Sequence, residues 1–208
     1  MTRTVVLLSG RGSNFKALLD ANLPATFTAA ISNRPEAAGL DYARARGIPA
    51  IALDHKSFPS RKAFDEALIH EIEKAGADLV VLAGYMRILT KAFVERYQGR
   101  LINIHPSLLP MFPGLHTHEA ALREGVKIHG CTVHFVTAEL DHGPIIIQAA
   151  VPVLANDTPD TLAARVLAQE HRIYPQAVRW FAEGKLDISD GHVNVREDSV
   201  SQWVLSTP

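Results

Sequence analysis

Cysteine is almost absent from this sequence: Cys131 is the only one among 208 residues. A single cysteine cannot form an internal disulfide, so the sequence excludes a disulfide-stabilised fold and favours a reducing compartment, the cytoplasm. Long hydrophobic runs are missing too. No apolar stretch approaches the roughly 20 residues that cross a bilayer, so we expect no membrane helix. The first residues lead directly into an apolar strand, and we therefore expect no signal peptide.

The sequence also lacks an excess of either charge. Lys and Arg total 21 against 22 Asp and Glu, for a net charge of −1. Nucleic-acid binding depends on a surplus of cations, so this balance argues against a nucleic-acid partner, although a local basic pocket for a small anion stays open. The ten histidines and one cysteine form no compact ligand set along the chain, and we predict no metal site.

What the sequence does have is a high apolar content, 47%, arranged in alternating strand-like and helix-like segments. In the first hundred residues we expect strands at 4–8, 27–31, 49–53 and 78–83, and helices after Asn14, at 35–46 and at 61–75. Such alternation is typical of a parallel sheet that is covered by helices on both faces.

The pattern changes after a fifth strand, which ends at His105. Residues 130–137 and 143–148 predict two strands whose short connection makes them antiparallel. A long helix is expected from Pro159 to about Glu183. The predicted fold class is therefore α/β: a three-layer, Rossmann-like mixed sheet with a parallel N-terminal half, antiparallel strands added in the C-terminal half, and helices on both faces.

The length suits one large domain. We expect a single domain at 1–184, with one half at 1–100 for phosphate binding and another at 101–184 for catalysis. A C-terminal hairpin and tail should follow at 185–208, where Asp190-Gly191 signals the turn.

A glycine-containing turn, Ser9–Asn14, lies between the first strand and the first helix. Backbone N–H groups at such a helix start bind anions, phosphate above all. Position 15 holds Phe in place of the third glycine of a dinucleotide fingerprint, and no acidic residue ends the second strand, so a monophosphate fits better than NAD. An ordinary tight turn is the alternative.

The segment Asn103–Pro110 ends the fifth strand and carries the predicted chemistry. Alternation along a strand places the side chains of Asn103 and His105 on the same side, and Pro106 then stops the strand. An amide donor beside an imidazole suits a developing oxyanion. Asp141 lies in the loop between the two antiparallel strands and could meet His105 there; an ordinary turn aspartate is the alternative.

Three further groups have both a functional and a structural interpretation. Met86, Ile88 and Leu89 follow the fourth strand, where they would form either an apolar pocket or part of the core. Arg61 begins a helix and could be a solvated surface cation. Gln169 and Glu170 lie on the long helix and could belong to a solvated face.

Five segments in order resemble the glycinamide ribonucleotide formyltransferases, a family of folate-dependent enzymes of purine synthesis. The resemblance extends to about residue 184 and rests on Ser9–Asn14, Ala83–Leu89, Asn103–Pro110, His129–His134 and Leu140–Pro144. The combination of Asn103, His105 and Asp141 is shared by folate formyl transferases and hydrolases. The glycine turn and the Gln169–His171 segment point to the ribonucleotide.

The resemblance implies that 10-formyltetrahydrofolate donates a formyl group to the amine of glycinamide ribonucleotide without an acyl-enzyme. It implies that Asn103 holds the formyl oxygen, that His105 as imidazolium stabilises the oxyanion, and that Asp141 supports the charged His105 and helps to move a proton. It also implies that the ribonucleotide is bound by Gly12, Ser13, Asn14, Gln169 and Glu170. The implied folate contacts are Arg61, Met86, Arg87, Ile88, Leu89, Asn103, Thr137, Ala138, Glu139, Leu140 and Asp141.

Other functions remain in view. A formyltetrahydrofolate hydrolase would use the same three residues with water as acceptor, but we expect no room for its additional N-terminal domain because the first strand begins at Thr4. A methionyl-tRNA formyltransferase would need an RNA-binding domain and a basic surface. A sugar-phosphate binding module without catalysis would not need Asn103, His105 and Asp141. We expect a monomer or a homodimer.

Overall fold

The computed structural model describes residues 1–196 and 201–205. It divides into two compact units, Met1–Asn103 and Ile104–Pro208. Parts of the predicted tail, 197–200 and 206–208, lie outside the described residues. The organisation as one domain at 1–184, with a phosphate-binding half at 1–100 and a folate-binding and catalytic half at 101–184, stays a prediction.

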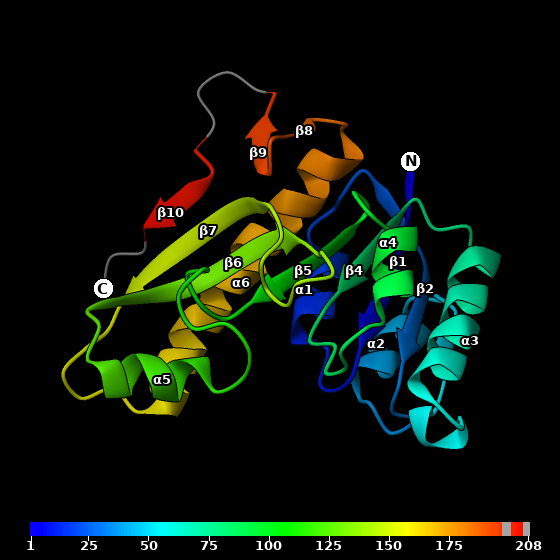
Figure 1. Cartoon of the computed structure of the whole chain (residues 1–208), viewed down its shortest axis with the longest axis horizontal. Coiled ribbons are helices and arrows are strands. Elements are labelled where there is room, and N and C mark those ends of the chain that lie inside the picture. Colours follow the sequence, from blue (N-terminus) through cyan, green and yellow to red (C-terminus); the bar gives the residue numbers. More distant parts are fainter. Residues whose placement is uncertain (197–200, 206–208) are drawn as a thin grey trace. The chain divides into compact units, whose positions relative to one another are not determined.

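The strands of the N-terminal unit are all parallel, as predicted (Figure 1). They are β1 (Thr2–Leu8), β2 (Ala25–Ser32), β3 (Ala50–Ala52), β4 (Leu79–Leu82) and the start of β5 (Leu101–His105), in the order β3-β2-β1-β4-β5. The apolar runs of β1 and β4 are buried, which explains why they show no alternation. The order reverses at β1, so β1 and β4 flank the switch point where open α/β sheets bind ligands.

Two pairs of helices cover this parallel sheet. Helix α1 (Ser13–Asp20) packs on α2 (Gly39–Ala45), which also contacts β2 and β3, and α3 (Arg61–Lys74) packs on α4 (Lys91–Arg96). Parallel crossovers are right-handed, so the reversal at β1 places the two pairs on opposite faces and gives three layers. The predicted helix at 35–46 begins later, at Gly39, because the backbone turns first, with Ala37 N donating to Arg34 O. Helix α4 was not predicted.

The C-terminal unit contains the predicted antiparallel pair. Strands β6 (Ile128–Phe135) and β7 (Ile145–Pro152) pair from Ile128 with Pro152 to His134 with Ile145, so both strands differ from the predicted 130–137 and 143–148. Strand β10 (Trp203–Leu205) adds in parallel to β7 and was not predicted. The predicted hairpin is present as β8 (Leu186–Ser189) and β9 (His192–Val195).

Two helices complete this unit. Helix α5 (Thr117–Glu124) packs on α6 (Pro159–Ala182), and α6 covers β6 and β7. A capping box of Thr158 and Thr161 starts α6, with Pro159 in its first turn, and the helix continues through Pro175. The predicted α/β class, with parallel strands first and antiparallel strands added later, is confirmed.

Candidate active site

His105 ends β5 with an oxygen atom facing each ring nitrogen. Its Nε2 lies 3.0 Å from the carbonyl oxygen of Phe112, which can only accept, so Nε2 carries a proton and donates it. Its Nδ1 lies 3.6 Å from Oδ2 of Asp141, an ion-pair distance rather than a hydrogen bond. His105 is 5% exposed. The Nε2 side of the ring is held by the hydrogen bond to Phe112, and the Nδ1 side faces the Asp141 carboxylate.

Asp141 belongs to the loop between β6 and β7. Its φ of +52° is left-handed, which short polar residues in turns adopt, so the turn interpretation describes its backbone correctly. Its carboxylate is nevertheless directed inward: Oδ2 accepts a hydrogen bond of 2.8 Å from the Gly114 amide and faces His105. The backbone amide fixes the carboxylate at that distance from the ring.

Asn103 lies two residues before His105 in the same strand. Alternation along β5 directs both side chains to the same side of that strand. Asn103 is partly exposed, whereas Ile102 before it is fully buried. The accessible amide is therefore on the side of β5 that carries the imidazole.

The glycine turn holds α1 close to α2. Gly12 has a φ of +75°, and a Cβ atom added there would lie 2.6 Å from Cα of Gly39. Gly39 N also donates to Gly10 O at 2.9 Å. The first turn, Ser13–Lys16, is neutral or basic, as the positive end of a helix requires if it is to attract an anion. The turn has the backbone geometry of an anion-binding helix start.

The loop after β4 exposes apolar side chains. Met86 and Ile88 are 57% and 58% exposed, so the interpretation of these two as core residues is wrong. The Arg87 guanidinium lies over the ring of Phe64, 4.9 Å from its centroid. Arg61 begins α3 and is exposed, as the surface-cation alternative expected. Large apolar groups that face solvent at a strand's carboxyl end are suited to a ring-shaped ligand.

The predicted folate loop of the C-terminal unit and the two polar residues of α6 differ in burial. Leu140 is 57% exposed in the loop that runs through Thr137, whose hydroxyl donates to Glu139 O. Gln169 and Glu170 are only 6% and 8% exposed, so the solvated-face interpretation is wrong. Gln169 Oε1 accepts from Arg172 at 3.0 Å.

Backbone groups near His105 were missed at the sequence level, since backbone partners leave no side-chain pattern. The Phe112 carbonyl and the Gly114 amide both come from the proline-rich segment after β5. The buried hydroxyl of Thr132 anchors that segment by donating to Ser107 O and accepting from Leu109 N. Thr132, a polar residue within the predicted strand at 130–137, is a signal that the sequence does contain.

Buried histidines make the stability of the C-terminal unit depend on pH. Burial lowers the pKa of His118 and His134; it also lowers that of His129, to about 4, with a further contribution from the neighbouring His118. An unfolded histidine protonates near pH 6.5. Between about pH 6.5 and about pH 4 the unfolded chain therefore binds protons that folded His129 does not, and stability is lost as the pH falls through that window.

We expect His129 to contribute a fall of about 2 kcal/mol in the free energy of unfolding between about pH 7.5 and about pH 5. Urea titrations at both pH values measure the fall. His129→Asn should reduce it, whereas His192→Asn, at an exposed position in β9, should leave it unchanged. A fall of equal size in the wild type and His129→Asn would refute this origin.

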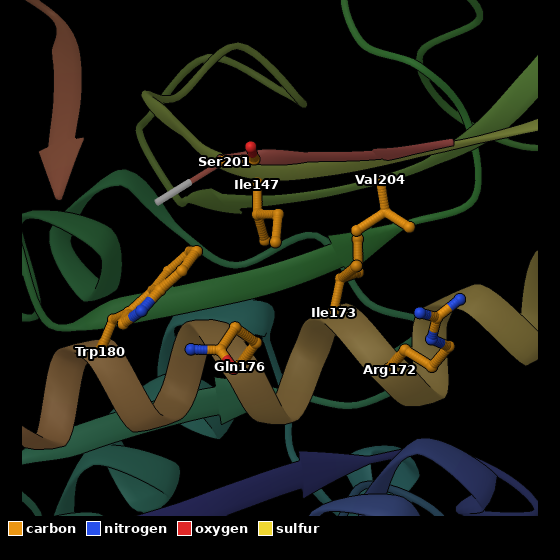
Figure 2. Close-up of a pocket in the computed structure, with 7 residues that line it drawn as sticks. All are labelled: Ile147, Arg172, Ile173, Gln176, Trp180, Ser201 and Val204. Atoms are coloured by element: carbon orange, nitrogen blue, oxygen red, sulfur yellow. The ribbon is translucent and has the colours of Figure 1, made fainter. Parts of the chain in front are cut away.

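A cavity of about 620 Å³ lies between α6, β7 and β10 of the C-terminal unit (Figure 2). Its lining consists of Ile147, Arg172, Ile173, Gln176, Trp180, Ser201 and Val204, a set that shares no member with the predicted site residues. The predicted active site is therefore not this cavity. Among the described residues, no cluster of His, Cys, Asp and Glu could hold a metal ion, and no helix is long and apolar enough to cross a membrane.

Comparison with known proteins decides the family. The sequence profile described as formyl transferase matches residues 2–178. The chain belongs to the formyl transferase family. It is 54% identical over 190 residues to phosphoribosylglycinamide formyltransferase of Escherichia coli K12, which covers 89% of this chain and 90% of that protein. The resemblance predicted from the five segments is confirmed.

Two other relatives extend the comparison. The human trifunctional purine biosynthetic protein adenosine-3 is 46% identical over 90% of this chain, which spans 19% of that longer protein. The crystal structure of glycinamide ribonucleotide transformylase 1 from Symbiobacterium toebii matches with a TM-score of 0.93 and 50% identity, over 95% of both chains. The fold and the enzyme class of this chain are those of a formyltransferase.

Proposed function

We propose that this formyltransferase transfers the formyl group of 10-formyltetrahydrofolate to the amine of glycinamide ribonucleotide. The products are N-formylglycinamide ribonucleotide and tetrahydrofolate, as in de novo purine biosynthesis, and the enzyme acts in the cytoplasm. The observation that carries the proposal is the approach of Asp141 Oδ2 to 3.6 Å from His105 Nδ1. The high identity to the Escherichia coli formyltransferase supports the choice of acceptor.

The proposed chemistry needs no covalent enzyme intermediate. The amine attacks the formyl carbon, and the formyl oxygen becomes an oxyanion that accepts hydrogen bonds from the Asn103 amide and the His105 imidazolium. The Asp141 carboxylate faces Nδ1 of His105, orients the ring and stabilises the imidazolium electrostatically. When the bond from carbon to the folate nitrogen breaks, the proton lost by the amine passes to that nitrogen, directly or through water, with Asp141 assisting.

The remaining predicted residues are assigned to binding. The amides of Gly12, Ser13 and Asn14 bind the substrate phosphate, and Gln169 and Glu170 bind its ribose. The folate is bound by Arg61, by Met86, Arg87, Ile88 and Leu89, and by the loop from Thr137 to Asp141. The burial of Gln169 and Glu170 and the exposure of Met86 and Ile88 support these roles. The enzyme works as a monomer or homodimer with small-molecule substrates.

The proposal is tested by following the absorbance of tetrahydrofolate release with and without glycinamide ribonucleotide. We expect release only when both substrates are present. Equal release without the ribonucleotide would identify a hydrolase that uses water as acceptor, and would overturn the assignment of the acceptor.

Asp141→Asn isolates the carboxylate charge. The amide oxygen of Asn can still accept from the Gly114 amide, so the loop should keep its backbone, but the charge that faces His105 is lost. We expect kcat to fall by about two orders of magnitude with both KM values changed little. Asp160→Asn, at an exposed position in the first turn of α6, is the matched control. Normal turnover in Asp141→Asn would remove this residue from the mechanism.

A further inference from the structure

Ser9 lies between two loops of the N-terminal unit that were assigned to different substrates. It follows β1 and begins the glycine turn, and its backbone N–H donates to the carbonyl of Gly84, the second residue after β4. The distance is 3.1 Å, and Ser9 is 2% exposed. The start of the glycine turn and the start of the Gly84–Leu89 loop are therefore in direct contact.

The hydroxyl of Ser9 adds a second, directional link. Met86 N lies 2.8 Å from Ser9 Oγ and can only donate, so the hydroxyl accepts there. Its single proton then goes to Oδ1 of Asn33, 2.5 Å away at the end of β2. Because the site is buried, loss of the hydroxyl leaves both the Met86 amide and the Asn33 oxygen without this partner.

The same network holds the other side of the loop. His55 Nδ1 lies 2.8 Å from the carbonyl oxygen of Asn33 and therefore donates to it. The His55 ring meets Phe64 edge to face, with centroids 6.5 Å apart, and Phe64 in turn supports the Arg87 guanidinium at 4.9 Å. Ser9 holds the Met86 amide and Phe64 holds the Arg87 guanidinium. A displacement of this loop therefore changes the hydrogen bond between Met86 and Ser9.

The glycine turn that follows Ser9 is also constrained. Gly10 O accepts from Gly39 N, and Gly12 touches Gly39, so the turn is packed against α2. An anion bound by the amides that follow Gly12 fixes the backbone of this turn, and Ser9 is the residue from which the turn starts. Binding at the turn therefore restricts the residue that holds the Met86 amide.

We propose that the Ser9 hydroxyl couples the two substrate sites, so that ribonucleotide binding at the glycine turn changes the affinity of the Gly84–Leu89 loop for the folate. This coupling rests on the proposed function, which assigns a substrate to each loop. Ser9 is a positioning residue: it acts through the Met86 amide. Thermodynamic linkage requires that the folate change the affinity for the ribonucleotide by the same factor.

Calorimetry measures the coupling factor. The dissociation constant of glycinamide ribonucleotide is determined alone and with saturating tetrahydrofolate, which carries no formyl group to transfer. We expect a change of about fivefold in the wild type. Ser9→Ala should bring the factor close to one while each ligand still binds alone. Ser32→Ala is the matched control, since that buried hydroxyl at the end of β2 accepts from Arg34 N, and it should keep the wild-type factor.

Hydrogen exchange of the Met86 amide gives a readout in the wild type that needs no variant. Glycinamide ribonucleotide alone should slow this exchange, and inorganic phosphate should do so more weakly. The coupling would be overturned if Ser9→Ala had the same coupling factor as the wild type. It would also be overturned if the exchange of the Met86 amide stayed unchanged in a wild type that binds both ligands. If the wild type bound glycinamide ribonucleotide neither alone nor with saturating tetrahydrofolate, the proposed function would be refuted, and the coupling with it.

Discussion

Replacement of His105 by alanine is expected to lower kcat by at least about a hundredfold while both KM values change little. The imidazolium is assigned to the oxyanion, which exists only after attack on the formyl carbon, so its loss should affect turnover more than binding. The substitution also removes the donor to the Phe112 carbonyl and leaves the Asp141 carboxylate without its partner. Steady-state kinetics with both substrates varied measures the effect.

Two controls separate catalysis from folding in this experiment. His192→Ala changes an exposed histidine in β9 and should leave kcat unaltered. Thermal unfolding of His105→Ala should show a cooperative transition, which establishes that the unit still folds. Turnover within about twofold of the wild type would remove His105 from the mechanism, because an oxyanion donor contributes far more than that.

Gly12→Ala is expected to have the largest effect on ribonucleotide binding. The left-handed φ of +75° is unfavourable for alanine. The new Cβ would lie 2.6 Å from Cα of Gly39, and relieving this clash requires a shift of the backbone. We expect the free energy of unfolding to fall by about 2 kcal/mol and the KM for glycinamide ribonucleotide to rise by about tenfold, with a smaller change for the folate.

Gly99→Ala provides the matched control. Gly99 has a similar φ of +73°, but apart from Gly99 and its two chain neighbours no described residue has an atom within 4 Å of the added Cβ. This variant carries the backbone strain without the steric clash and should leave the KM for the ribonucleotide unchanged. Equal KM values for the wild type and Gly12→Ala would argue against phosphate binding at the glycine turn.

The fold class could be predicted from the sequence because the periodicity of apolar residues in each segment agrees with the burial of that segment in the structure. The unbroken apolar runs of β1 and β4 predicted buried parallel strands, and both strands are buried. Boundaries were less accurate where hydrogen bonds outside the regular elements decide them. The helix predicted from residue 35 begins at Gly39, since a turn comes first, and β10 is too short to be distinguished from a loop by its sequence.

Burial was the property that local patterns predicted least well. Gln169 and Glu170 are polar, and a helix pattern places such residues in solvent, yet they are almost fully covered. Met86 and Ile88 are apolar, and a residue preference places them in the core, yet they are exposed. In each case the position in the fold overrides the residue type, and the exceptions are residues with proposed binding roles.

The sequence by itself determined the α/β class, the family and the residue types of the proposed chemistry, because these depend on periodicity and on motifs a few residues long. Only the tertiary structure decided which groups meet. It placed Asp141, from a distant loop, within 3.6 Å of His105, gave that ring the Phe112 carbonyl, and put the Ser9 hydroxyl against the Met86 amide. Contacts between segments far apart in the chain are made by packing and by backbone hydrogen bonds, and local sequence patterns predict neither of them.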